Sequence, residues 1–199
     1  MTVVDSLQEI ADWLNETSCK KYAFKVPPKD VKAKIDDRYD YEKVHPHAFP
    51  LFVPAIERMP PQVISSMPSV CVQLIQGEDN RIIGERELAI NLGISCWNPG
   101  VHSNDIYYPK GKTPEIPEKF RLSEDGWMDV WNFADDILMK LESTSHIGKL
   151  ELFMTKNITF GPYKEQDAVP DLYPLWFAWI QFSVKAAFLR NNSEEEQFL

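Results

Sequence analysis

The sequence has few glycines and few cysteines, and both shortages exclude particular kinds of chemistry. With eight glycines in 199 residues, neither of the glycine-rich patterns that hold nucleotide phosphates, G-x-G-x-x-G and G-x-x-x-x-G-K-S/T, occurs. The three cysteines, Cys19, Cys71 and Cys96, are odd in number and form no C-x-x-C pair. We therefore expect reduced thiols rather than a disulfide framework, and no nucleotide cofactor.

Positive charge and long apolar runs are also scarce. The 21 lysines and arginines are outnumbered by 30 aspartates and glutamates, which gives a formal net charge of -9. An acidic surface repels the phosphate backbone, so we expect no sequence-specific nucleic-acid binding and no membrane association. The most apolar segment, residues 174–189, is interrupted by Gln181, Ser183 and Lys185 and is too short to span a bilayer. No basic and then apolar segment opens the chain, so we expect a cytoplasmic product.

Two segments repeat apolar residues with the helical period of about 3.6 residues. Residues 3–14 form the first, in which Ser6 and Glu9 match a capping box. Residues 126–142 form the second, and Asp136 is assigned to its solvent side, where substitution is expected to change stability little. The stripe predicted to be buried in the second helix consists of Trp127, Val130, Trp131, Ala134, Leu138 and Leu141.

Other segments alternate apolar residues with the period of two that is typical of a half-buried strand. They are residues 70–76, 86–97, 149–160 and 175–189. Polar turn residues between the first two predict a hairpin. Because helices and strands do not alternate regularly, we expect an α+β fold: a mainly antiparallel sheet of about four strands with helices packed on one face. We expect residues 1–190 to form a single domain, followed by an acidic tail at residues 191–199.

A proline-rich stretch interrupts this order between residues 27 and 69. Eight of the 15 prolines lie there, and each lacks a backbone donor and disfavours helix at the residue before it. The stretch also contains apolar residues that a disordered linker does not need, including Phe49, Phe52 and Ile56. We therefore expect an ordered arm or insertion that packs on another surface. A second irregular stretch covers residues 98–124.

Side chains suited to catalysis or metal binding lie mainly in the proline-rich stretch. His45 and His47 alternate as metal ligands can, but no cysteine or further histidine stands nearby to complete a zinc site. Ser65, Ser66 and Cys71 lack the G-x-S-x-G context of an activated nucleophile. The carboxylates weighed for acid–base chemistry, and interpreted as a solvated loop, are Asp36, Asp37, Asp40 and Glu57. We predict no enzyme, no catalytic residue, no cofactor and no metal.

The stretch from residue 70 to residue 190 resembles the tail-terminator and tail-completion proteins of long-tailed bacteriophages and prophages. The resemblance rests on Pro68-Ser69-Val70-Cys71-Val72-Gln73-Leu74, on the strand at 86–97, on Asp125-Gly126-Trp127 opening a helix, and on the final pair of strands. It implies a minor tail protein without enzymatic activity, a small α+β domain that assembles into a ring, typically a hexamer, capping the tail tube. It also implies contacts with other tail or head–tail connector proteins, assembly in the bacterial cytoplasm, and a final location in the virion tail.

Ring assembly requires exposed surface that pairs between subunits. The proline-rich stretch can supply such surface, and so can the second face of the last predicted strand, which begins apolar and becomes polar at Gln181 and Ser183. The predicted subunit-interface residues are Phe49, Phe52, Ile56, Leu175, Phe177 and Trp179.

Two functions of other classes stay open. One is a hydrolase whose site is built from the two long loops, and a pocket that joins His45, His47 and several carboxylates would favour it. The other is a monomeric adaptor whose arm docks on a different protein. A flat or ring-shaped contact surface would favour the ring subunit over the hydrolase.

Overall fold

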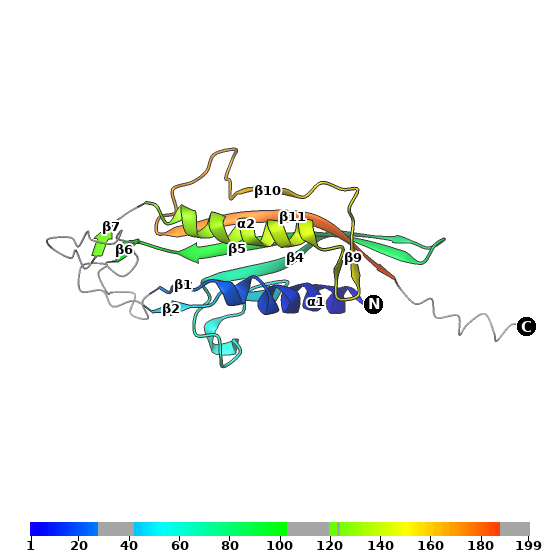
Figure 1. The fold of residues 1–199 in the computed structure, drawn as a ribbon, viewed down its shortest axis with the longest axis horizontal. Coiled ribbons are helices and arrows are strands. Elements are labelled where there is room, and N and C mark those ends of the chain that lie inside the picture. Colours follow the sequence, from blue (N-terminus) through cyan, green and yellow to red (C-terminus); the bar gives the residue numbers. More distant parts are fainter. Residues whose placement is uncertain (28–41, 103–119, 123, 188–199) are drawn as a thin grey trace, which may run out of the picture.

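The computed structural model describes residues 1–27, 42–102, 120–122 and 124–187. In this part of the chain, seven strands form one curled, mixed sheet, and two α-helices pack on it (Figure 1). The sheet follows the order β3 (His47–Pro50), β4 (Ser69–Asn80), β5 (Glu85–Trp97), β11 (Leu175–Ala187), β9 (Leu150–Leu152) and β8 (His146–Ile147), and β10 (Thr159–Pro162) also pairs with β11. The helices are α1 (Val3–Glu16) and α2 (Trp127–Ser143).

Two small sheets and two short helical turns complete the described elements. The two small sheets lie at the end of the structure opposite the tip of the β4–β5 hairpin (Figure 1). The elements are β1 (Phe24–Lys25) with β2 (Lys43–Val44), β6 (Gly100–His102) with β7 (Phe120–Leu122), and the 3-10 turns η1 (Cys19–Lys21) and η2 (Ile56–Arg58).

The expected fold, a mainly antiparallel sheet of about four strands with helices on one face, is wrong. The sheet is larger and mixed because β3, which belongs to the expected proline-rich arm, joins it. β3 pairs in parallel with β4, from His47 opposite Ser69 to Pro50 opposite Val72. Proline is tolerated there because it ends a strand at the edge of the sheet, where a missing N–H removes little of the hydrogen-bond ladder. Residues 28–41 of the arm and the predicted tail, residues 191–199, lie outside the described residues.

The single strand expected at residues 149–160 is instead two strands. β9 pairs with Val184 and Lys185 of β11, whereas β10 pairs with the segment 178–181 of the same strand. A turn around Met154 separates β9 from β10, and both Met154 and Phe160, which share the apolar register of the predicted strand, are exposed. Lys156 interrupts that apolar register between Met154 and Ile158, and it lies in the turn.

The long central strands confirm the predicted hairpin. β4 and β5 pair antiparallel, although the two strands extend further than expected, to Asn80 and from Glu85. β5 also pairs with β11 over the full length of both strands, from Glu85 opposite Ala187 to Trp97 opposite Leu175. Successive side chains of a strand point to opposite faces, so this pairing sends one set into the core and the other to a second surface.

Both helices share one hydrophobic core with the sheet. α1 contacts mainly β3 and β4, and α2 contacts mainly β11 and β5. The capping box of α1 involves Thr2 and Asp5, whose side chains and backbone N–H groups bond reciprocally, rather than the predicted pair Ser6 and Glu9. No helix within the described ranges is long and apolar enough to cross a membrane.

The buried side of α2 includes four residues of the predicted stripe but is broader than predicted. The four are Val130, Ala134, Leu138 and Leu141. Phe133 and Ile137, which the prediction omitted, are fully buried. Trp127, which the prediction placed inside, is 49% exposed, and Trp131 is only partly buried. The acidic residue assigned to solvent, Asp136, is 3% exposed. The prediction for this helix was therefore correct in position and for four of the six stripe residues, and wrong at Trp127 and Asp136.

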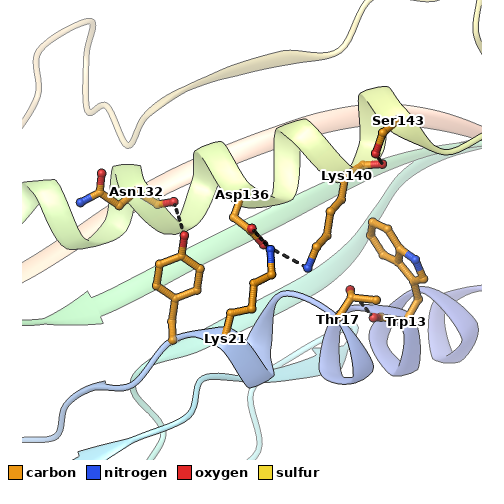
Figure 2. A network of polar contacts seen from close by, with 8 residues as sticks. Trp13, Thr17, Lys21, Asn132, Asp136, Lys140 and Ser143 are labelled. Carbon is orange, nitrogen blue, oxygen red and sulfur yellow. Dashed lines mark hydrogen bonds and ion pairs between the residues drawn. The ribbon is translucent and has the colours of Figure 1, made fainter.

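Two ammonium groups compensate for the burial of Asp136. Lys21 Nζ donates to Asp136 Oδ1 at 2.7 Å, and Lys140 Nζ lies 3.1 Å from Oδ2 (Figure 2). Burial alone raises the pKa of this carboxyl, but the hydrogen bond from Lys21 and the ion pair with Lys140 outweigh it and keep the pKa below its ordinary value. Because Lys21 follows α1 and Lys140 belongs to α2, this cluster connects the two helical segments.

We predict that Asp136→Asn lowers the free energy of unfolding by about 1.5–3 kcal/mol at neutral pH, the range for hydrogen bonds to charged groups. Because the folded pKa of Asp136 is lowered, its contribution is present above the unfolded pKa and is lost as the pH falls through the folded value. The difference from wild type should therefore shrink in acid. Denaturant titrations of the variant and wild type, at neutral pH and in acid, measure this difference in the free energy of unfolding.

The matched control is Asp135→Asn, which removes the exposed neighbouring carboxylate and should change stability by less than about 0.5 kcal/mol. Equal losses in the two variants would contradict the assigned role of Asp136.

Candidate interaction groove

The second face of the sheet forms an open groove of about 1600 Å³. Its floor consists of the alternate side chains of β4, β5 and β11 that do not enter the core. Along β11, for example, Ala178 and Ile180 are buried in the core, whereas Phe177 and Trp179 are half-buried and line the groove. The period of two in these strands therefore produces a core on one side and a groove on the other.

Two segments outside the long strands form the rims of the groove. The segment 51–57, between β3 and β4, lies along one side, and Ile56 in η2 is 55% exposed there. Tyr163 and Lys164, which follow β10, lie on the other side. Each rim has one charged side chain, Glu57 on the first and Lys164 on the second, and both are exposed. The groove is thus apolar along its walls and has charges of opposite sign at its rims.

The floor of the groove is polar along its middle. Asn91 donates to the amide oxygen of Gln73 at 2.9 Å, and Gln181 donates to the Asn91 amide oxygen at 3.4 Å, so one row of amides crosses three strands. The hydroxyls of Ser69 and Ser95 are 2.9 Å apart across the β4–β5 pair. Because these groups bond to one another, they are satisfied without a ligand.

Gly93 leaves a depression in this floor. It lies in β5 between Cys71 of β4 and Trp179 of β11, which pair with it on either side. A Cβ added at Gly93 would be 3.9 Å from the Cys71 Cβ and 4.0 Å from the Gln73 side chain, which is ordinary contact distance. A methyl group therefore fits above Gly93 without a clash, and the groove opens over it.

Trp179 is fixed on the wall of the groove by β10. Its indole N–H donates to the carbonyl of Pro162 at 2.9 Å. A Cβ at Gly161 would come within 2.9 Å of the indole, so glycine at this position lets the ring pack directly on the β10 backbone. The ring of Phe177 lies 6.1 Å from that of Tyr163, centroid to centroid. The half-buried aromatics are thus held in place and keep one side open to the groove.

The groove has no acid–base pair among its described residues. None of those that line it is a histidine, and Glu57 is their one carboxylate. Cys71 is the candidate nucleophile that lines it, and its thiol donates to the Leu51 carbonyl at 3.2 Å. Burial raises the pKa of the Cys71 thiol above its ordinary value, so the thiol form dominates at neutral pH.

The residues that would have favoured a hydrolase do not come together in the described structure. His45 Nδ1 lies 2.6 Å from the carbonyl oxygen of Tyr22, and His47 is half-buried with its ring 4.7 Å from that of Phe49. Burial lowers the pKa of His47, although Asp12 opposes this effect. Within the described ranges, no three His, Cys, Asp or Glu side chains group as metal ligands. Three of the weighed carboxylates, Asp36, Asp37 and Asp40, lie outside those ranges.

The predicted interface residues fall into three environments. Phe49 is buried within the chain itself, so it has almost no surface left for a neighbour. Phe52 is 57% exposed next to the groove rim. Ile56, Phe177 and Trp179 line the groove together, from elements more than a hundred residues apart in sequence. The sixth, Leu175, is half-buried and lines a smaller hollow with Trp127 and Trp131.

Gly93 and Tyr163 line the groove but were not among the predicted interface residues. For Gly93, the strand alternation contained a usable signal. Gly93 shares the alternation of Asn91 and Ser95, so it could have been placed on the second face of β5. Its position opposite Trp179 depends on strand register, which the sequence alone does not specify.

A comparison with models of known protein families finds no match to this chain, and a comparison with curated proteins finds no significant match either. The function proposed below therefore rests on the groove and on the resemblance described above.

We predict that the native protein reacts slowly at Cys71 with iodoacetamide at neutral pH and faster as the pH is raised toward the thiol pKa. The thiolate is the reactive form, and a raised pKa leaves little of it. Labelling followed by mass spectrometry of peptides measures the rate, and the unfolded protein is the control. Rapid labelling that is already complete in mild acid would show a lowered pKa and would restore Cys71 as a candidate nucleophile.

Proposed function

We propose that this chain is a structural assembly subunit of the tail-terminator type, which forms a ring with copies of itself at the end of a phage tail tube or at the head–tail junction. The observation that supports this most directly is the open groove on the second sheet face, with its fixed aromatics Phe177 and Trp179. Soluble proteins seldom leave contiguous apolar surface uncovered unless it contacts another molecule.

The chemistry of the groove favours a contact surface over a reaction site. Its polar side chains bond to one another, its thiol is protonated at neutral pH, and its walls are apolar. An active site needs groups that can move protons or stabilise charge. The described groove offers hydrophobic area and shape, which are the properties of a binding surface.

The charge of the chain is compatible with a ring through which DNA passes. The formal net charge of -9 makes adhesion to phosphate unfavourable, so an acidic lumen would not retain the DNA. The proposed ring, hexameric in the resembled family, would form in the bacterial cytoplasm and remain in the virion tail. Its partners would be other tail or head–tail connector proteins.

The adaptor is the second candidate, because an open groove of about 1600 Å³ also fits a segment of a different protein. The two functions differ in self-association. A ring subunit should bury more than about 1,000 Å² against its neighbour in total, whereas an adaptor remains monomeric until it meets its partner.

We predict that the purified chain forms a closed oligomer, seen as a multiple of the protomer mass by light scattering and as rings in negative stain. Ile56→Glu should shift it to smaller, folded species, because the change puts a charge into the apolar rim. The matched control is Met139→Glu, which alters an exposed apolar residue of α2 that does not line the groove and should leave the oligomer intact. A chain that stays monomeric at every accessible concentration contradicts the ring subunit and favours the adaptor.

A further inference from the structure

The tip of the β4–β5 hairpin exposes two neighbouring isoleucines. Ile82 is 91% exposed and Ile83 is 61% exposed, in the turn between Asn80 and Glu85. The hairpin projects beyond the two helices, so its tip is set apart from the body of the molecule (Figure 1). Within the described structure, this tip is the most exposed apolar feature. Two exposed isoleucines at a hairpin tip lower the solubility of a protein unless another surface covers them.

The turn that presents the two isoleucines is ordered by Asn80. The Asn80 side-chain oxygen accepts hydrogen bonds from the backbone N–H of Ile82 at 3.1 Å and of Ile83 at 3.4 Å. The backbone carbonyl of Asn80 accepts from Gly84 N–H at 3.0 Å, and Gly84 has a φ of +72°, which favours glycine. The tip is therefore held in one conformation before it meets a partner, which lowers the entropy cost of binding.

The stalk of the hairpin is stiffened by ion pairs. Arg86 makes two hydrogen bonds to the Asp79 carboxylate on the opposite strand, at 2.5 and 2.8 Å. On the β5 strand close to the turn, Lys156 pairs with Glu87, and Lys185 lies 3.6 Å from Glu85. These contacts tie the hairpin to the turn after β9 and to β11, so the tip projects at a fixed angle.

The tip cannot enter the groove of its own chain. Gly93, at the floor of the groove, is eight residues along β5 from Glu85, where the hairpin turn ends. At about 3.3 Å per residue, the straight strand separates them by about 26 Å. A contact between tip and groove must therefore join two molecules, and because the surfaces differ, the contact runs head to tail. Head-to-tail contacts close into rings when the rotation between subunits allows it.

The two surfaces match in chemistry. The groove offers the apolar side chains of Phe177 and Trp179 and the depression at Gly93, where an added methyl group would lie at ordinary contact distance from its neighbours. Its rims bear Glu57 and Lys164, one charge of each sign. The end of the hairpin likewise has both signs, since Arg81 precedes the two isoleucines and Glu85 follows Gly84 after them. A protein interface usually has apolar side chains at its centre and charged side chains around them.

We propose that Ile82 and Ile83 of one subunit insert into the groove of the next copy, over Gly93 and between the rim residue Ile56 and the wall residue Trp179. This contact deepens the proposed ring function and rests on it. Each subunit then offers one tip and one groove, and ring closure leaves neither uncovered.

Two variants test the tip and the groove independently, because each one alters only one of the two surfaces. Ile82→Asp combined with Ile83→Asp removes the apolar side chains of the tip. Gly93→Ile occupies the depression at Gly93 with a residue that strands favour. Each variant alone should self-associate about 100-fold more weakly than wild type, as measured by sedimentation, because each loses the centre of the contact. Circular dichroism and thermal unfolding verify that both fold. Val169→Asp, at an exposed valine in the loop between β10 and β11, is the matched control and should associate as wild type does.

Mixing the two variants gives the decisive measurement. The filled-groove variant retains an intact tip, and the tip variant retains an intact groove, so one productive contact is possible between them. We expect a 1:1 heterodimer and no larger species. If wild type assembles but the tip variant assembles equally, or if the mixture contains only monomers, the insertion is overturned while the ring function stands. If wild type itself does not assemble, the ring function is overturned and the insertion with it.

Discussion

The pairing of β5 with β11 is the constraint on which the rest of the structure depends. All 13 residues of each strand take part, and the register sets Gly93 opposite Trp179 and Leu92 opposite Ile180. One alternate set of side chains thereby enters the core and the other lines the groove. A slip of one residue would exchange the two sets, exposing the isoleucines and leucines and burying the amides. The stability of the core therefore fixes the shape of the groove.

The sequence predicted the elements whose patterns are long and regular. β5 alternates over 13 residues, and α1 and α2 repeat at helical spacing, so their positions were predicted within a few residues. β3 and β8 are too short for a periodic signal, and β3 also lies in a proline-rich stretch. The alternation over residues 149–160 was read as one strand, although it covers both β9 and β10. Their place in the sheet is set by pairing with residues distant in sequence. This is why a mixed seven-stranded sheet was not predicted, and why Phe49 was expected at an interface rather than inside the fold.

The sequence prediction failed at two residues whose environment depends on tertiary neighbours. Asp136 was placed in solvent because it is charged, and Gly93 was overlooked because it is small. Asp136 is buried because Lys21 and Lys140 meet it from two different elements, a coincidence that only the tertiary fold provides. At the groove, Ile56, Phe177 and Trp179 were predicted from their apolar character, and the structure brings them together. Gly93 has no side chain that could indicate a function. It matters because of the large indole beside it, so it can be recognised only after the register is known.

The β4–β5 hairpin has an open strand edge as well as an apolar tip, and its charges disfavour pairing along that edge. β3 covers the outer edge of β4 only as far as Val72, and within the described residues no strand pairs with that edge beyond it. An open edge invites pairing with other chains. Here the bulge between Leu74 and Gln76 interrupts the edge, and the exposed carboxylate of Glu78 would repel a second copy of itself. Edge pairing between copies is thus disfavoured, and the apolar surface is confined to the tip. In the proposed ring, a tip would meet a groove in one orientation, whereas an edge can slide, so this division of charge and apolar surface would favour a closed assembly over open aggregation.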